Sequence, residues 1–207
     1  MNLPLQLLIA TGNEGKRSEL RQLLSGLPIS LSDLQAFPAI KRIAETGATF
    51  LENASLKAVG YATQTGLLTL ADDSGLEVDA LGGAPGVWSA RFAGESASDA
   101  DRIEALLAAL ESVDESKRTA RFVAAVVIAD SQGGLLSVSV GMCEGRIGLV
   151  PCGGRGFGYD PLFIPNGYEL TFAELDPETK NQISHRARAL AATIAYLRSL
   201  TARSATS

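Results

Sequence analysis

The feature of the sequence that most constrains the fold is a pair of long apolar segments beyond its midpoint. Residues 120–129 (ARFVAAVVIA) and 135–142 (LLSVSVGM) both have the composition of β-strands. Only residues 130–134 (DSQGG) separate them, and this stretch is rich in turn-forming side chains. A connection this short joins antiparallel strands, because parallel strands need a longer crossover. We therefore predict a β-hairpin here.

The segments before this hairpin alternate between strand and helix patterns. Residues 5–10 (LQLLIA) form an apolar run, and leucines at helical spacing follow it, which indicates a strand, a turn and a helix. A second helix is predicted from about Thr49, which has capping-box spacing to Glu52. Residues 67–71 (LLTLA) predict a buried strand that stops at residues 72–75 (DDSG). The predicted fold is a mixed α/β sheet flanked by helices.

The rest of the chain predicts two more helices and a loop. Residues 82–94 are rich in glycine and small side chains, which favours a loop. Apolar residues at helical spacing over 103–110 predict an amphipathic helix, and a final helix is predicted over 184–200. We expect one domain over residues 1–207, with a disordered tail from about Thr201.

Composition excludes several classes of protein. Hydrophobic residues make up 46% and charged residues 20% of the 207 residues, as in ordinary globular chains. No apolar run is long enough to span a membrane, so we expect no membrane partner. The net charge of -5 argues against nucleic-acid binding. Cys143, Cys152 and one histidine cannot form a Cys/His zinc site, and such sparse cysteines fit a reducing cytoplasm.

The segment after the first predicted strand has features of an anion site. Thr11-Gly12-Asn13-Glu14-Gly15-Lys16 joins a strand to the start of a helix. Backbone N–H groups and the helix dipole favour an anion at such a place, and Lys16 adds a cation. The segment is not a P-loop, because its glycines are closer together and Arg17 follows the lysine. An ordinary turn with Asn13 as the helix cap explains the segment equally well.

A second polar segment surrounds the start of the helix predicted from Thr49. Glu45-Thr46-Gly47 precedes this helix, and Asn53 and Lys57 lie within it. A carboxylate, an amide and an amine at this place could serve a metal ion and phosphates. A solvated helix start explains the same residues without any ligand, and this segment judged alone favours that interpretation.

Two adjacent carboxylates, Asp72 and Asp73, follow the strand predicted over residues 67–71. Carboxylates this close are costly unless they are solvated, paired or bridged by a cation. Carboxylates that hold Mg²⁺ together with its waters suit phosphoryl chemistry. The haloacid-dehalogenase pattern would need Asp-x-Asp, which differs from this pair. The alternative interpretation is an Asx-turn without a ligand.

A glycine-rich stretch later in the chain has features of a base-binding site. Residues 153–161 (GGRGFGYDP) allow close backbone approach to a ligand. Phe157 or Tyr159 could stack on a flat base, and Asp160 could accept hydrogen bonds from base N–H groups. The only histidine follows Ser184 and precedes Arg186 at a predicted helix start, where paired cations suit an anion or a purine carbonyl oxygen. A lone histidine is more often structural than catalytic.

As a set, these segments resemble the inosine triphosphate pyrophosphatase family, which acts on non-standard purine nucleotides. Each matching string is weak alone, but together they are highly specific, and they occur in family order from about Leu8 to Arg188. No helix of clustered glutamates of the Nudix type is present. The matching strings are TGNEGK, ETGATFLENASLKA, ADDSGLEVDALGGAPGVWSARFAG, EGRIG, GFGYDPLF and KNQISHRARAL.

The resemblance implies an elongated mixed α/β subunit with two lobes around a central cleft, and a homodimer. It implies that Asp73 is the general base and a Mg²⁺ ligand, with Glu45 as the second acid at the metal. Ala44 stands before Glu45 where some relatives carry another acid, so the metal assignment rests more firmly on Asp73. The substrate-binding residues implied by the matching motifs are Thr11, Gly12, Asn13, Glu14, Gly15, Lys16, Lys57, Ser74, Phe157, Gly158, Tyr159, Asp160, Lys180, His185 and Arg186.

The implied function is that of a cytoplasmic hydrolase that converts ITP, dITP and XTP to the monophosphate plus pyrophosphate. Selectivity would come from His185 and Arg186, because donors pair with the C6 carbonyl of hypoxanthine and xanthine and meet the amine of adenine unfavourably. A pyrophosphatase of broader specificity and a non-hydrolysing nucleotide-binding regulator are the alternatives. An RNA-binding module is a weaker one, because the chain has no basic, aromatic-rich stripe.

Overall fold

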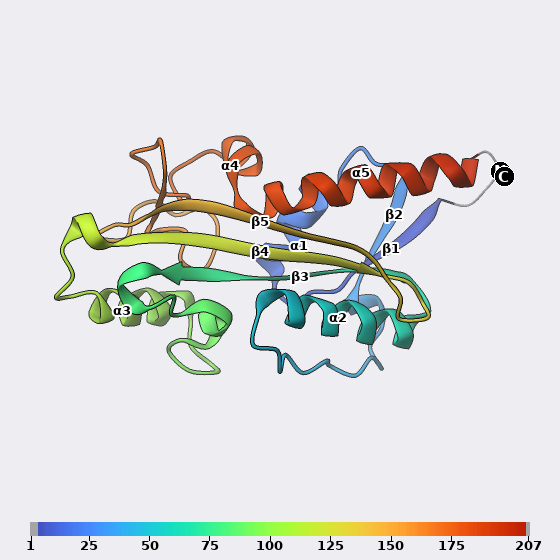
Figure 1. Ribbon diagram of the computed structural model, residues 1–207, viewed down its shortest axis with the longest axis horizontal. Coiled ribbons are helices and arrows are strands. Elements are labelled where there is room, and N and C mark those ends of the chain that lie inside the picture. Colours follow the sequence, from blue (N-terminus) through green and yellow to red (C-terminus); the bar gives the residue numbers. More distant parts are fainter. Residues whose placement is uncertain (1–3, 206–207) are drawn as a thin grey trace. The chain divides into compact units, whose positions relative to one another are not determined.

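The computed structural model describes residues 4–205, which form a six-stranded sheet flanked by helices (Figure 1). The strand order is β2-β1-β3-β4-β5-β6. β1 pairs in parallel with β2 and β3, whereas β5 pairs antiparallel with β6, so the predicted mixed α/β fold is confirmed. The strands are β1 (Leu5–Ile9), β2 (Ile29–Asp33), β3 (Leu68–Val78), β4 (Thr119–Ala129), β5 (Leu135–Ile147) and β6 (Phe163–Pro165). The helices are α1 (Glu14–Leu23), α2 (Phe50–Thr65), α3 (Asp99–Ala109), α4 (Pro177–Ile183) and α5 (His185–Ala205).

The predicted hairpin is confirmed as β4 and β5, which are neighbours in the sheet. Its turn is closed by Asp130, whose Oδ1 accepts the backbone N–H groups of Gln132 and Gly134, each at 2.9 Å. β5 continues to Ile147 rather than ending at Met142, because its last residues pair with β6. The extension places glycine where a side chain would collide, since a Cβ at Gly145 would strike the Ile164 carbonyl oxygen.

The chain forms two compact units. The first unit comprises residues 1–73, 124–141 and 186–207. Its main core packs α1 and α5 against the sheet, and α2 covers the opposite face (Figure 1). The buried members of this core are Leu7, Ile9, Leu20, Leu24, Leu70, Ala124, Val126, Ile128, Ala189, Leu190 and Leu197.

The second unit comprises residues 74–123 and 142–185 and has its own core. Three phenylalanines lie at its centre, with ring centroids 4.7 Å apart for Phe122 and Phe163 and 5.0 Å apart for Phe163 and Phe172. Such pairs add to the stabilisation that burial of the rings already provides. α3 contributes Leu106 to this core, and Leu110, the C-cap of the helix, contributes as well.

The prediction that the strand of residues 67–71 stops at residues 72–75 is wrong. β3 runs from Leu68 through both aspartates to Val78, so the Asx-turn interpretation is also wrong. Asp72 and Asp73 are 0% and 6% exposed, and each lies beside a lysine. The strand tolerates these carboxylates because cations compensate their buried charge.

Other differences concern the ends of segments. The part of the chain predicted as a loop over residues 82–94 contains a short 3₁₀ helix, Gly86–Arg91, and follows another, Asp79–Leu81. α5 continues to Ala205, and the last two residues of the predicted disordered tail lie outside the described residues. Within residues 4–205, no helix combines the length and the apolar character needed to cross a bilayer.

Candidate functional site: two clusters of charged residues

The predicted anion segment forms the turn between β1 and α1 in the first unit. Asn13 is the N-cap of α1, and its side-chain oxygen accepts the Lys16 N–H at 2.9 Å. The Asn13 N–H in turn bonds the Thr11 hydroxyl at 3.2 Å. The capping interpretation is therefore confirmed, and this cap holds the turn in the shape that aims Lys16. Glu14 is exposed and pairs with Arg17 on the same helix.

The two adjacent aspartates of β3 pair with different cations. Successive side chains of a strand point to opposite faces, so Asp72 and Asp73 project to opposite sides of the sheet. Asp72 pairs with Lys16 from α1, whereas Asp73 pairs with Lys57 from α2. The arrangement keeps the two carboxylates apart although they are neighbours in sequence.

Asp72 lies at the centre of a buried ionic cluster. Its Oδ2 is 3.2 Å from the Lys16 ammonium nitrogen and 3.4 Å from Nη2 of Arg186. The Arg186 guanidinium also forms an ion pair with Glu19 of α1, and the arginine is only 1% exposed. The cluster thus links α1, β3 and the start of α5. A carboxylate buried this deeply requires such cations.

The surroundings of the two cations shift their pKa values in opposite directions. Burial lowers the pKa of Lys16 below its usual value of 10.5, and the nearby charges of Lys57 and Arg186 add to this effect against the attraction of Asp72. For Arg186 burial also acts to lower the pKa, but Asp72 and Glu19 outweigh it and raise the value. Lys16 is therefore the cation of this cluster that gives up its proton more easily.

On the other side of the strand, one ammonium group bridges two carboxylates. Lys57 Nζ is 2.9 Å from Asp73 Oδ1 and 3.2 Å from Glu45 Oε1. It also donates to the Asp72 carbonyl oxygen at 2.8 Å. Burial acts to lower the pKa of Lys57, but Asp73 and Glu45 outweigh burial and raise it above 10.5. Lys57 therefore stays charged and fixes the orientation of Asp73.

The oxygens around Lys57 are the kind that hold Mg²⁺. Glu45 and Asp73 direct carboxylate oxygens at one point, as their distances to Lys57 Nζ show. Within the described part of the chain, no group of three or more His, Cys, Asp or Glu side chains has the geometry of a metal site. This donor set fits Mg²⁺, which commonly binds one or two carboxylates and completes its shell with waters and substrate phosphates.

The segment with Glu45 is attached to the start of α2. Asn53, 1% exposed, accepts the Gly47 N–H at 2.8 Å, and a Cβ at Gly47 would collide with Glu52 and Asn53. Thr49 caps α2 as predicted by accepting the Glu52 N–H, while the Glu52 carboxylate accepts the Ala48 N–H at 2.6 Å. These bonds fix the backbone that leads from Glu45 into the helix.

The glycine-rich loop in the second unit is organised around Asp160. This carboxylate, 3% exposed as a residue, accepts the Phe157 N–H at 2.9 Å and pairs with Lys180 of α4 at 2.5 Å. Gly156 has φ +74°, and a Cβ there would collide with the Asp160 carboxylate, so this position requires glycine. The Lys180 ammonium lies 5.3 Å from the centroid of the Phe157 ring.

Tyr159 and His185, two other predicted base-site residues of the second unit, are buried in its core. Tyr159 donates from its hydroxyl to the Ser89 carbonyl at 2.9 Å, and burial raises its pKa well above the usual value of 10. The His185 ring stacks on Phe122 with centroids 4.8 Å apart and planes 14° apart. Ser74 is half-buried in β3. The tyrosine therefore anchors the loop, and stacking fixes the plane of the histidine ring.

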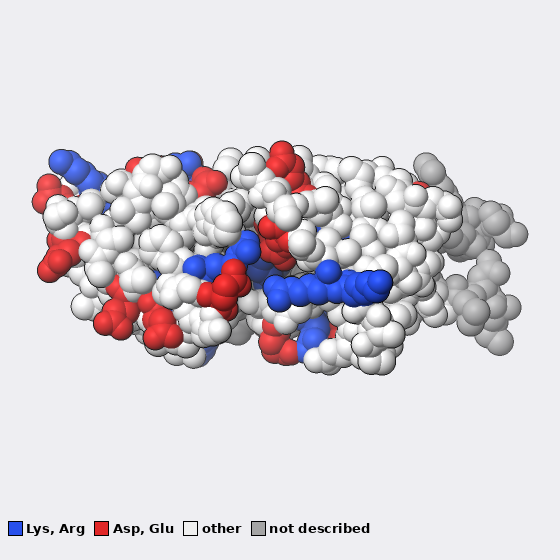
Figure 2. All heavy atoms as spheres, turned by 90° about the horizontal axis from the view of Figure 1, so that it is seen from below, with Lys and Arg blue, Asp and Glu red and all other residues white. Residues whose placement is uncertain are grey.

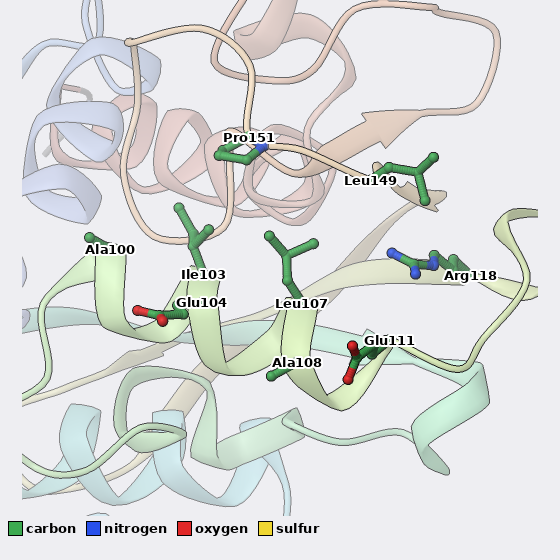
Figure 3. A pocket seen from close by; sticks show the side chains of 9 residues that line it. All are labelled: Ala100, Ile103, Glu104, Leu107, Ala108, Glu111, Arg118, Leu149 and Pro151. Atoms are coloured by element: carbon green, nitrogen blue, oxygen red, sulfur yellow. The ribbon is translucent and has the colours of Figure 1, made fainter.

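A hollow of about 720 Å³ occurs in the second unit along α3. Figure 3 shows Ile103 and Leu107 pointing from α3 toward the segment with Leu149 and Pro151. None of the residues that line this hollow is a predicted site residue.

The face in Figure 2 has acidic side chains next to basic ones, which differs from the basic stripe typical of nucleic-acid binders.

Comparison with known proteins shows the family of the chain. The model of the Ham1 family matches residues 7–196. The chain belongs to the Ham1 family. A relative from Desulforamulus reducens named dITP/XTP pyrophosphatase is 50% identical over 90% of this chain and 92% of its own length. The family resemblance stated from the sequence is thereby confirmed.

Solved structures of Ham1 relatives have the same fold. A HAM1 protein from Coxiella burnetii has a TM-score of 0.85 and 44% identity, and covers 94% of this chain and 99% of its own. A structure titled nucleoside-triphosphatase, or dITP/XTP pyrophosphatase, from Mycobacterium abscessus has a TM-score of 0.72 and 43% identity, with coverages of 91% and 97%. The mixed α/β fold is thus shared by solved Ham1 proteins.

Several site contacts in this Ham1 chain were not predicted from its sequence. Glu19 and Asp72 join Lys16 and Arg186 in the ionic cluster, whereas the sequence indicates only that Asp72 needs solvent or a cation and gives no partner for it. Asp99 accepts a hydrogen bond from Gly158, which is distant in sequence. The position of Glu19 gives a weak local indication of its role, because it lies one helical turn after Gly15 of the predicted anion segment. Pairing over such distances in sequence leaves no local pattern.

We predict that Arg186→Met lowers the stability of the ligand-free protein by about 3 kcal/mol, because Glu19 and Asp72 lose their shared buried cation. Urea unfolding measures the change. Arg198→Met is the matched control, since Arg198 is exposed on the same helix and should change stability by less than about 0.5 kcal/mol. Equal effects of the two substitutions would show that the buried cluster contributes nothing to folding.

Proposed function

We propose that this Ham1 protein is a nucleoside triphosphate pyrophosphohydrolase that converts ITP, dITP and XTP to the monophosphate and pyrophosphate. The observation that carries the proposal is the arrangement of Asp73, Glu45 and Lys57, in which two carboxylates converge on one cation. The relatives from D. reducens and M. abscessus are named dITP/XTP pyrophosphatase, which supports this reaction with dITP and XTP. Removal of such nucleotides cleanses the nucleotide pool, and we place this activity in the cytoplasm, where that pool is held.

In the first unit, we assign the β1–α1 turn over residues 11–16 to the phosphates. Lys16 supplies a cation beside backbone N–H groups at the start of α1, where the helix dipole favours negative charge. Lys57 adds a second cation, and its raised pKa keeps that cation charged. The two lysines together offset the charge that builds on the leaving pyrophosphate.

We assign Asp73 and Glu45 to Mg²⁺ and the general base role to Asp73. Bound there, Mg²⁺ would polarise phosphate oxygens and lower the pKa of a bound water. Asp73 accepts the proton of the water that attacks phosphorus, while the anhydride bond between the monophosphate and the pyrophosphate breaks. Lys57 holds Oδ1 of Asp73 at 2.9 Å, so the carboxylate meets this water in one orientation.

In the second unit, we assign the loop over residues 157–160 and Lys180 to the base. The Phe157 ring offers a flat stacking surface, and its neighbour Lys180 fixes its position from 5.3 Å. His185 of this unit is a proposed donor to a C6 carbonyl oxygen, and so is Arg186, which belongs to the first unit. The stacking of His185 on Phe122 and the ion pairs of Arg186 restrict each donor to one orientation, which a selective hydrogen bond requires.

We predict that Asp73→Asn lowers kcat for pyrophosphate release from ITP by about a thousandfold, because the amide cannot accept the proton of water. EDTA should abolish the activity of the unchanged enzyme, since the proposed mechanism needs the metal. Asp114→Asn is the control, because Asp114 is exposed and pairs only distantly with Lys117. An Asp73→Asn enzyme that stays fully active and folded would refute the assigned role.

We predict that the KM for ITP rises at alkaline pH before an ordinary lysine would titrate. The pKa of Lys16 is lowered, so its ammonium loses a proton as pH rises through that value, and the neutral amine binds phosphate poorly. Lys16→Arg should keep KM flat over the same range, because a guanidinium stays charged. Steady-state kinetics for both proteins across this pH range measure KM. Identical pH profiles of KM for the two proteins would show that Lys16 is not the titrating group.

We also propose that the enzyme is a homodimer, as the family resemblance implies. An exposed apolar row on β5 supports this proposal: Leu136, Val138 and Val140 are 38%, 48% and 53% exposed. These residues alternate along the strand and therefore share one face. Contiguous exposed apolar surface of this kind is typical of protein interfaces.

Light scattering should give twice the chain mass for the native protein and the single-chain mass for a Val138→Lys, Val140→Lys variant. Two buried lysine charges would oppose association through this face. Gln132→Lys in the exposed hairpin turn is the control and should leave the mass unchanged. A variant that keeps the dimer mass would locate the interface elsewhere, and a monomeric native protein would contradict the homodimer.

A further inference from the structure

The backbone on both sides of Phe157 is held by carboxylates. The Phe157 N–H donates to Oδ2 of Asp160 at 2.9 Å. The next N–H, that of Gly158, donates to Oδ2 of Asp99 at 2.7 Å. Asp160 belongs to the loop itself, whereas Asp99 is the first residue of α3. The two bonds fix the peptide groups before and after Phe157, and thereby the direction in which its ring leaves the backbone.

Asp99 is itself held in place by Arg102 on the next turn of α3. The Arg102 guanidinium forms an ion pair with Oδ1 of Asp99, which leaves Oδ2 directed at Gly158. Nη1 of Arg102 donates to the Ala90 carbonyl at 3.0 Å and to the Ala97 carbonyl at 2.7 Å. Arg102 therefore connects α3 to the segment that also holds Tyr159, whose hydroxyl bonds the Ser89 carbonyl.

The glycine-rich loop around Phe157 has a composition that allows many conformations, but hydrogen bonds anchor it at several points. Gly156 and Gly158 have φ values of +74° and +61°, which glycine adopts readily, and glycine also gives an unconstrained chain many other conformations. A loop of this kind needs tertiary bonds to keep a single shape. Asp99 supplies a charged acceptor for the one N–H that follows the stacking ring, and hydrogen bonds to charged groups are among the stronger ones.

We propose that Asp99 is a positioning residue for base recognition. It acts through the Gly158 N–H to hold Phe157 in the orientation that stacks on the purine, without touching the nucleotide itself. The inference rests on the proposed function, because it assigns Phe157 to the base. It predicts that loss of Asp99 weakens binding of the base and leaves the chemical step at the phosphates unchanged.

The test compares three variants for pyrophosphate release from ITP and from ATP. Asp99→Ala removes the acceptor, and we expect KM for ITP to rise by about tenfold while kcat stays within about twofold. The ratio of kcat/KM for ITP to that for ATP should fall, because Phe157 no longer holds the base in the position from which the site distinguishes the two nucleotides. Asp99→Asn should restore most of KM and of this ratio, since its amide oxygen can accept the same N–H.

Asp101→Ala is the matched control, because Asp101 lies on the same turn and its side chain bonds the helix cap Ser98. Its Oδ2 accepts from Ser98 N and Oγ at 2.7 Å each, which completes the capping box of α3. Its loss should lower the urea midpoint but leave KM and the ITP to ATP ratio unchanged.

The outcomes separate the inference from the proposed function. If Asp101→Ala raises KM as much as Asp99→Ala, helix stability explains the effect and the inference is overturned. If Asp99→Ala equals the unchanged enzyme, or lowers kcat alone, the inference is also overturned while the proposed function stands. If the unchanged enzyme releases no pyrophosphate from ITP, the proposed function itself fails.

Discussion

The first unit depends on the compensation of two buried carboxylates that follow one another in β3. Asp72 and Asp73 are nearly inaccessible, and an uncompensated carboxylate at such depth would destabilise the strand strongly. Strand geometry sends them to opposite faces, where Lys16 with Arg186 and Lys57 with Glu45 surround them. Each cation comes from a helix next to the sheet, so the positions of α1, α2 and α5 are tied to these charges. The structural requirement and the proposed chemistry thus use the same residues.

Much of the fold follows from local patterns. The hairpin of β4 and β5 was predictable from two apolar runs and a short polar turn, and α2 from the cap Thr49. β2 was missed although Ile29, Leu31 and Asp33 lie at alternate positions, because five residues give a weak period. α4 also carried a signal, since Asp176 caps it and Pro177 occupies its first position.

The end of β3 and the charged contacts could not be predicted, because they depend on partners far along the chain. The sequence Asp72-Asp73-Ser74-Gly75 has a local preference for a turn, and tertiary ion pairs override it. Arg186 lies beside His185 in sequence, yet its contacts are with Glu19 and Asp72 of the first unit. Asp99 and Gly158 likewise meet across a long stretch of chain. Local sequence patterns thus indicate the chemical groups of the site but not the contacts among them.

Pyrophosphate release from ITP, XTP, dITP, GTP and ATP, measured in parallel with Mg²⁺, tests the central claim most directly. We predict fast release from ITP, XTP and dITP, and a kcat/KM for ATP lower by about a hundredfold or more, because the C6 amine of adenine mispairs with the proposed donors. We also expect slow release from GTP, but guanine shares the C6 carbonyl, so its rejection must depend on the group at its 2-position. Equal rates with ATP and ITP would contradict the base selectivity and indicate a broader pyrophosphatase. Tight binding of ITP without pyrophosphate release would contradict hydrolysis itself and indicate a nucleotide-binding regulator.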